Sequence, residues 1–281
     1  MIKRKSIITV LAVSILLVIS AHADDAKPLR VISLAPATTE ILFALGLDDE
    51  IVGVSQYCNF PEKALTKEQV GSMSSPNIER IMALKPDIVF MTGLEQEPTI
   101  AKLRQLNIKV FVSDPPNIEE LYSSIDNMGR LVGRENEAAE IISRMKADIA
   151  AISDKVAPIP LNERPKVFVE IWNNPIMTAG KGSYIDDLIN IAGGINIAGD
   201  TKRPYSYFNV EEVIKRNPDC IIMGYMDKID GRELTAKRFG WENISAVKNG
   251  RVYNDINPDI MFRPGPRVVE GIRQIHKRLY P

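Results

Sequence analysis

The apolar positions of the chain follow two patterns, short continuous runs and longer stretches with helical spacing. Short apolar runs between polar residues predict buried strands, and such runs occupy residues 30–34, 51–55, 109–112, 166–171 and 251–253. Apolar residues three or four apart predict helices, as at residues 39–45 and 184–192. Strands that alternate with helices predict an α/β fold with mostly parallel sheets.

A repeated segment organises the two halves of the chain. Residues 77–91 and 209–223 match at a constant offset of 132 residues. Asn77 and Asn209 are predicted helix N-caps, and a glutamate in each first turn favours the positive end of the helix dipole. A proline then ends each helix before a short apolar strand. Each segment is therefore predicted to form a helix, a turn and a strand.

One long amphipathic pattern lies between the halves. From Glu135 to Val156, apolar residues recur every three or four positions and charged residues occupy the other face, so a helix of roughly 30 Å is expected. We therefore predict two similar α/β lobes with central, mostly parallel sheets, joined by one long backbone helix. The predicted boundaries are 24–134 for the N-terminal lobe, 135–157 for the linking helix and 158–281 for the C-terminal lobe. The alternative is a single α/β enzyme domain with an accidental repeat.

The first 23 residues have the pattern of a secretory signal peptide. Lys3, Arg4 and Lys5 precede an apolar run at residues 7–19, and small residues stand at the two positions that a signal peptidase reads. We expect cleavage before Asp24 and export as a soluble periplasmic protein. An uncleaved anchor is the alternative, and no cysteine follows the run to accept a lipid.

Charge and residue types exclude several classes of function. Residues 1–23 contain three basic residues, so their removal moves the formal net charge from −1 to about −4. The chain therefore lacks the clustered basic face of a nucleic-acid-binding protein. Only His276 remains as a histidine, and the sequence has no GxGxxG or GxxxxGK[ST] motif. We predict no catalytic residues, no metal site and no cofactor. Cys58 and Cys220 lack CxxC spacing and could be free or paired.

Aromatic and charged residues concentrate in segments that follow or precede predicted strands. Ligands of open α/β sheets bind at the carboxyl ends of strands, and aromatic walls with few polar groups are typical of ligand pockets. We therefore expect a binding cleft between the lobes rather than a catalytic centre. The candidate residues are Pro36, Ala37, Tyr57, Met73, Trp172, Tyr205, Asp259 and Arg263.

The sequence resembles the helical-backbone (class III) periplasmic substrate-binding proteins of ABC importers for corrinoids, iron–siderophores and haem. The resemblance covers essentially the whole mature chain: residues 31–40 are similar to the family's first strand and helix, and the most specific marks are residues 52–57, 77–81 and 84–87. It implies a non-enzymatic protein, expected to be a monomer, that hands a small ligand to a permease in the inner membrane.

Within this family the chain is most similar to the cobalamin-binding members, which implies a cobalt corrinoid as the ligand. The resemblance implies that Tyr57 lines the corrin pocket and that Asp259 and Arg263 make its polar contacts. Met73 and Tyr205 stand where those members have tryptophan.

The resemblance also gives roles to charged residues outside the corrin pocket. It implies that Glu79 and Glu211, one in each lobe, bind arginines of the permease. The alternative is that both carboxylates only complement helix dipoles. The alternative ligand class is an anionic siderophore or haem held by Arg263 and Arg267, because guanidinium groups suit carboxylates.

Overall fold

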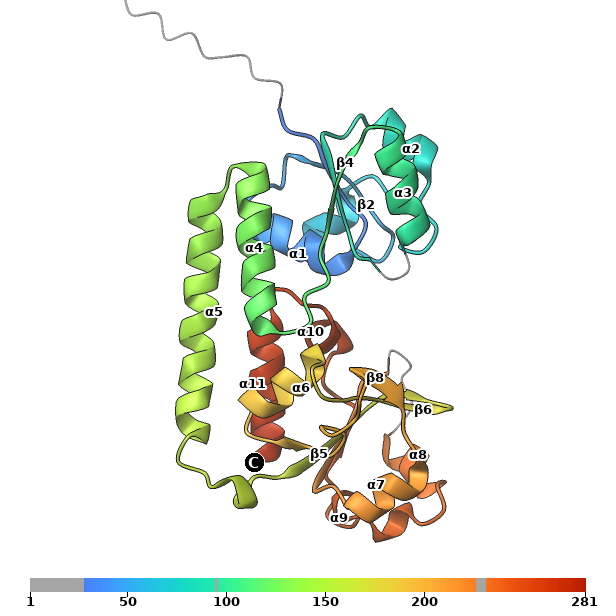
Figure 1. Cartoon of the computed structure of the whole chain (residues 1–281), viewed down its shortest axis with the longest axis vertical. Helices are drawn as coiled ribbons and strands as arrows, with labels where there is room; N and C mark the ends of the chain where they lie inside the picture. The colour runs from blue at the N-terminus through green and yellow to red at the C-terminus, as the bar shows by residue number, and fades with distance from the viewer. Residues whose placement is uncertain (1–27, 94–95, 226–230) are drawn as a thin grey trace, which may run out of the picture.

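The computed structural model describes residues 28–93, 96–225 and 231–281. The predicted signal peptide and its cleavage before Asp24 lie outside the described residues. Figure 1 shows two α/β lobes beside a layer of long helices, which confirms the predicted fold class. Among the described residues, no helix has the length and apolar character needed to cross a membrane.

The first lobe, here the N-lobe, is built on a wholly parallel four-stranded sheet. Its strand order is β2-β1-β3-β4, and the two central strands are buried along their whole length, as expected for strands that are covered on both faces. The strands are β1 Val31–Ser33, β2 Ile51–Val54, β3 Ile88–Met91 and β4 Lys109–Val112, and the helices are α1 Pro36–Ala44, α2 Ile78–Ala83 and α3 Glu97–Gln105. Pro36 begins α1, so this helix starts three residues before the helix predicted at residues 39–45.

The second lobe, here the C-lobe, has a mixed sheet. Its order is β10-β9-β5-β6-β8, with β7 also paired to β5. The β5–β6 and β6–β8 pairs are antiparallel. β6 follows β5 after only two residues, and so short a connection cannot form a parallel crossover. The strands are β5 Lys166–Asn173, β6 Ile176–Ala179, β7 Ile195–Asn196, β8 Tyr205–Tyr207, β9 Cys220–Met223 and β10 Val252–Tyr253.

The C-lobe strands correct two sequence predictions. Trp172 lies inside β5, which runs past the strand predicted at residues 166–171, and Tyr205 begins β8, a strand that the sequence analysis did not predict. The helices of this lobe are α6 Tyr184–Ile191, α7 Val210–Arg216, α8 Gly231–Ala236, α9 Ser245–Lys248, α10 Pro258–Phe262 and α11 Val268–Leu279. Asp259 lies in α10, and Arg263 is the residue that follows its last turn.

Two helices connect the lobes. Helix α5 spans Glu135–Val156, as predicted, while α4 Ile118–Val132 was not predicted. The Asn117 side chain caps α4, and Gly133 follows its last residue at a φ of 68°; this left-handed conformation suits glycine and lets the chain reverse into α5. In Figure 1, α5 runs beside α4 and continues past α11, so it lies along both lobes.

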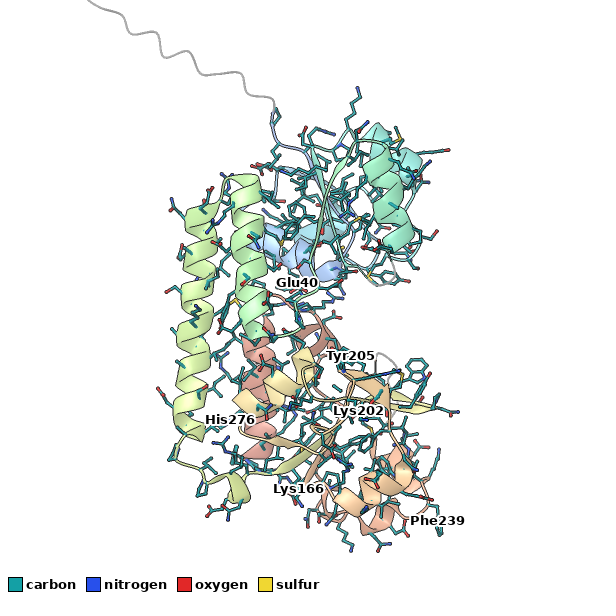
Figure 2. The ribbon with its side chains drawn as sticks, viewed as in Figure 1. Glu40, Lys166, Lys202, Tyr205, Phe239 and His276 are labelled. Carbon is teal, nitrogen blue, oxygen red and sulfur yellow. The ribbon has the colours of Figure 1, made fainter. Side chains whose placement is uncertain are left out.

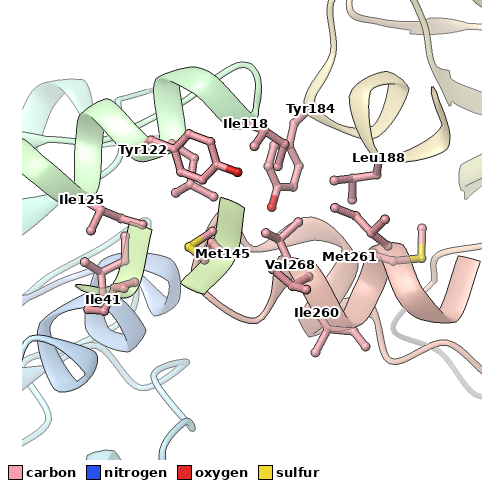
Figure 3. Close-up of a cluster of buried hydrophobic side chains, with 14 of the residues drawn as sticks. Ile41, Ile118, Tyr122, Ile125, Met145, Tyr184, Leu188, Ile260, Met261 and Val268 are labelled. Carbon is pink, nitrogen blue, oxygen red and sulfur yellow. The ribbon is translucent and has the colours of Figure 1, made fainter. Parts of the chain in front are cut away.

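The lobes share one hydrophobic core. A single cluster of buried side chains includes residues of α1, α4 and α5 together with residues of α6, α10 and α11. Figure 3 shows Tyr122 of α4 and Tyr184 of α6 on either side of Ile118, with Val268 of α11 below them. The two lobes are therefore fused along the helix layer rather than joined by a flexible linker.

The repeat is a structural one. Asn77 and Asn209 both accept hydrogen bonds from the first turns of α2 and α7, which confirms the predicted caps. Asp87 and Asp219 are also equivalent. Each carboxylate accepts a hydrogen bond from the backbone N–H at the start of the neighbouring strand, at Arg30 (2.8 Å) and Lys166 (2.9 Å) respectively. The same local device thus fixes the helix–strand unit in both lobes.

Candidate functional site

The candidate residues of the N-lobe lie around the start of α1 and in the segment after β2. Tyr57 has 53% of its surface exposed, whereas Ala37 is buried and Pro36 is half-buried. Met73 is half-buried, and its backbone carbonyl accepts a hydrogen bond from the Gln96 amide at 2.7 Å. Of these four candidates, Tyr57 offers the largest exposed surface to a ligand.

A row of apolar side chains crosses three strands of the C-lobe. Trp172 of β5 is paired with Met177 of β6, and Met177 is paired with Tyr207 of β8. Directly paired residues project from the same face of a sheet, and so do residues two apart on one strand, so Tyr205 joins this face. The exposed fractions are 54% for Trp172, 71% for Tyr207 and 46% for Tyr205. We call these four residues the aromatic row.

The aromatic row borders a cavity with cationic residues. The cavity has a volume of ≈ 480 Å³ and is lined by Met177, Lys202, Arg203, Tyr205, Ser206 and Tyr207. Figure 2 shows Tyr205 on the side of the C-lobe that faces the N-lobe, with Glu40 on the facing side of the N-lobe. The apolar wall and the two cations therefore border the same cavity, and Tyr205 of this cavity lies on the side of the C-lobe that faces the N-lobe.

Glu40 of α1 forms a buried polar connection between the lobes. Its side chain is only 2% exposed, and it accepts two hydrogen bonds from Arg267, from Nε at 2.7 Å and from Nη2 at 2.5 Å. Arg263 donates a third at 3.3 Å, and the Arg267 guanidinium also lies 3.8 Å from the ring centroid of Phe60. A buried carboxylate needs such partners, so this network is a structural clamp between α1 and the segment before α11.

Asp259 and Arg263 join the same network. Their side chains form an ion pair at 2.8 Å, and Arg263 also donates to Asn59 Oδ1 at 2.6 Å. Asn59 in turn donates to Asp259 Oδ2 at 3.3 Å. The structure thus brings two predicted contact residues of the C-lobe next to the segment that holds Tyr57. Arg263 and Arg267 both form ion pairs with Glu40. Neither guanidinium group is therefore free to hold an anionic siderophore or haem, as the alternative ligand class required.

A buried tyrosine lies between the two halves of the candidate site. Burial raises the pKa of Tyr184 well above its usual value, and the nearby Tyr205 and Glu40 add to the rise. The Tyr184 hydroxyl has no hydrogen-bond partner among the described residues. Burial alone also raises the pKa of Tyr205. Both hydroxyls therefore stay protonated near neutral pH and can donate hydrogen bonds.

The cysteines and the histidine are packing residues. Cys58 and Cys220 are both free and buried, in different lobes. The Cys58 thiol contacts the Thr39 and Ser55 hydroxyls at 3.0 and 3.2 Å, so it lies beneath the surface rather than in contact with a ligand. His276 is half-buried, with Nδ1 3.0 Å from the Ala192 carbonyl oxygen.

The buried acidic side chains of the described residues are used in ion pairs and do not form a metal centre. Glu170 of β5 is fully buried but is neutralised by a two-point ion pair with Arg238, at 2.5 and 2.6 Å. Within the described residues, no group of three or more histidine, cysteine, aspartate or glutamate side chains is placed to hold a metal ion.

Glu79 and Glu211 lie in the first turns of α2 and α7. Both side chains are exposed, and Figure 1 places the two helices in different lobes, well apart. Neither residue belongs to the aromatic row or to the Glu40 network.

Several residues of the site escaped the sequence analysis. The pairing of β6 with β8 was needed to identify four of them, namely Met177, Lys202, Arg203 and Tyr207. The spacing of Tyr205 and Tyr207, two residues apart, is a strand signal that could have identified one exposed face. Glu40 stands as a single charge in the apolar pattern of α1, which is the available sign of a buried ion pair.

Comparison with known proteins identifies relatives along most of the chain. The family model described as "Periplasmic binding protein" matches residues 31–257. The uncharacterized ABC transporter substrate-binding lipoprotein YvrC of Bacillus subtilis is 35% identical over 262 residues, covering 91% of this chain and 81% of that protein. A vitamin B12-binding protein of Vibrio cholerae is 30% identical over 255 residues, covering 89% and 90%.

Solved structures share the architecture. A possible iron-binding, periplasmic solute-binding protein of Staphylococcus epidermidis is 31% identical with a TM-score of 0.81, covering 90% of this chain and 98% of that one. The S. aureus protein IsdE, solved with haem, is 26% identical with a TM-score of 0.77, covering 90% and 99%.

Proposed function

Because this chain belongs to the periplasmic binding protein family, we propose that it captures a cobalt corrinoid such as cobalamin between its lobes and delivers it to the permease of an ABC importer. The proposal includes a non-enzymatic role and a periplasmic location after removal of the signal peptide. Membership of the family supports a role as a substrate-binding protein. The support for a corrinoid ligand comes from the residues of the site.

The observation that carries the proposal is the aromatic row. Folded proteins seldom leave several large apolar side chains exposed together unless they bind something. Trp172, Met177 and Tyr207 lie side by side in register and offer a flat surface to a planar macrocycle. Tyr57 of the N-lobe, also half-exposed, would contact the other side of the ligand. Contact with apolar surface would supply most of the affinity.

Polar contacts would orient the ligand. We propose that Asp259 and Arg263, fixed by their mutual ion pair and by Asn59, act as the polar floor of the site and meet corrin amides. Pro36, Ala37, Met73 and Tyr205 complete the proposed contacts. Because the Glu40 network already holds Asp259 and Arg263, these two side chains would lose little freedom on binding.

Delivery would use a separate surface. We propose that Glu79 and Glu211, one exposed carboxylate at the start of a helix in each lobe, form ion pairs with arginines of a two-fold permease. The shared core along α5 favours a small closure around the ligand rather than a wide hinge. The protein is proposed to act as a monomer, without nucleic acid or a resident cofactor.

A second candidate is an anionic iron chelate, either haem or a ferric siderophore. Lys202 and Arg203 beside the aromatic row favour it, because carboxylates suit cationic side chains. The names of the staphylococcal relatives add support.

Calorimetric titration of the mature protein with cyanocobalamin, dicyanocobinamide, haem and a ferric siderophore tests the proposal. Tight one-to-one binding of either corrinoid, with weaker binding of the iron chelates, is expected. Binding of haem or siderophore alone would replace the corrinoid by the second candidate. Binding of none of the four would remove the metal-chelate class.

A further inference from the structure

Two adjacent cations beside the aromatic row stand without acidic partners in the described part of the chain. Lys202 and Arg203 are exposed, and neither forms an ion pair with a carboxylate of the described residues. Several arginines of the C-lobe are instead neutralised, for example Arg216 by Asp200 at 2.5 Å and Arg278 by Asp255 at 2.8 Å. Lys202 and Arg203 therefore leave a local excess of positive charge in a protein of nearly balanced charge.

The segment that carries these cations is held in place. The Thr201 hydroxyl donates to the Arg203 carbonyl at 3.1 Å, and the Gly180 N–H donates to the Pro204 carbonyl at 2.8 Å. A side chain on Gly180 would collide with Thr201 and meet the Arg203 carbonyl, so the two loops are in close contact. The backbone thus fixes the start of both cationic side chains next to β8.

Both cations and three residues of the aromatic row line one cavity of ≈ 480 Å³. A guanidinium and an ammonium beside aromatic faces can bind an oxyanion while its apolar part rests on the rings. We propose that this cavity is an anion subsite of the ligand site, in which Lys202 and Arg203 hold a phosphate or carboxylate group of the ligand. The inference rests on the proposed function, and it adds that the ligand carries an anionic group.

Two ligand chemistries could supply that group. A complete cobalamin carries one phosphodiester, whereas dicyanocobinamide lacks it. Haem carries two propionate carboxylates, and its dimethyl ester has none. Each pair therefore compares an anionic ligand with a counterpart that lacks the anion but keeps the macrocycle.

The test combines these pairs with the double variant Lys202→Gln/Arg203→Gln. We expect the variant to bind the anionic member of the pair about tenfold more weakly than the wild type, because it loses charge-assisted hydrogen bonds. Its affinity for the neutral counterpart should change less than about twofold, because a cycle of this kind isolates one interaction. The wild-type affinity for the anionic ligand should also fall with added salt.

A matched control removes the same kind of charge elsewhere. Lys166→Gln alters an exposed lysine at the start of β5, roughly 20 Å along the strand from Trp172, and should leave all affinities unchanged. Circular dichroism of each variant checks that the fold is retained. An equal loss for both members of a pair, or no loss for either, would overturn the anion subsite while leaving receptor function intact.

A ligand-free measurement separates this inference from the proposed function. The chain has two tryptophans, and Trp241 is fully buried, so quenching of fluorescence by ions reports on exposed Trp172. Iodide should quench more strongly than caesium in the wild type, and the preference should decrease in the double variant but not in Lys166→Gln. If no corrinoid or haem binds, the proposed function fails. The difference between iodide and caesium quenching then still tests whether the cavity attracts anions. Equal quenching in wild type and double variant would then refute the anion subsite.

Discussion

Replacing Glu40 with glutamine tests whether the ion pairs between the lobes stabilise the fold. Glutamine keeps the size of the side chain and one acceptor oxygen but removes the charge. Removing one partner of a buried pair costs about 3–5 kcal/mol. Arg263 and Arg267 remain 13% and 24% exposed and can regain some hydration, so we expect a loss of about 2–3 kcal/mol. For a chain of this size that loss lowers Tm by about 5–10 °C.

Thermal and urea unfolding followed by circular dichroism measure this loss. The matched control is Glu50→Gln, because the Glu50–Arg134 pair is also long-range but more exposed, with 22% and 35% of the side chains accessible at 3.2 Å. Exposed pairs contribute under about 1 kcal/mol, so the control should lower Tm by no more than a few degrees.

A double-mutant cycle sharpens the result. Glu40→Gln and Arg267→Gln should together cost less than the sum of the single losses, because they remove the same interaction. If Glu40→Gln destabilises no more than Glu50→Gln, or if the two losses at the clamp simply add, the clamp does not stabilise the fold and the reasoning is wrong.

Three further predictions concern the ligand, the partner and the thiols. Tyr57→Ala should weaken ligand binding about 5- to 30-fold in calorimetry, and an unchanged affinity would remove Tyr57 from the site. The double change Glu79→Ala/Glu211→Ala should leave ligand affinity intact but impair uptake by cells; normal uptake would refute the docking role. Burial raises the pKa of Cys58, and that of Cys220 to about 12, so neither thiol should react with a disulfide reagent at pH 8 until the protein unfolds. As pH rises above about 9, Cys220 ionises only in the unfolded chain, so the free energy of unfolding should fall by up to about 1.4 kcal/mol per pH unit, and Cys220→Ala should flatten this slope.

The features that the sequence predicts well are those encoded by neighbouring residues. The caps at Asn77 and Asn209, the prolines after each helix and the strands that follow are local signals, and the structure has all of them. Lys85 and Asn217, at equivalent positions of the repeat, even share a left-handed backbone with φ of 47° and 46°. The amphipathic pattern of residues 135–156 was also long enough to predict both ends of α5.

The features that the sequence does not predict depend on pairing between distant segments. β8 has only three residues, too few to give a clear alternation, and its pairing with β6 decides that Tyr207 and Met177 are neighbours. The irregular register between Glu170 and Trp172 means that counting along β5 does not give the face on which Trp172 lies. For Glu40, no local pattern identifies partners that belong to the last part of the chain.

The sequence separation of the Glu40 clamp has a consequence for synthesis and export. Its partners Arg263 and Arg267 lie 223 and 227 residues further along the chain. Because chains fold from the N-terminus as they emerge, the N-lobe leaves the ribosome or the translocation channel with a carboxylate that has no counter-charge. The final native contacts between the lobes form only when the last segment has crossed. A chain that stops before Arg263 would contain all the described strands of both sheets but would lack both arginines and α11, so Glu40 gains its ion-pair partners only in a chain that includes the last helix.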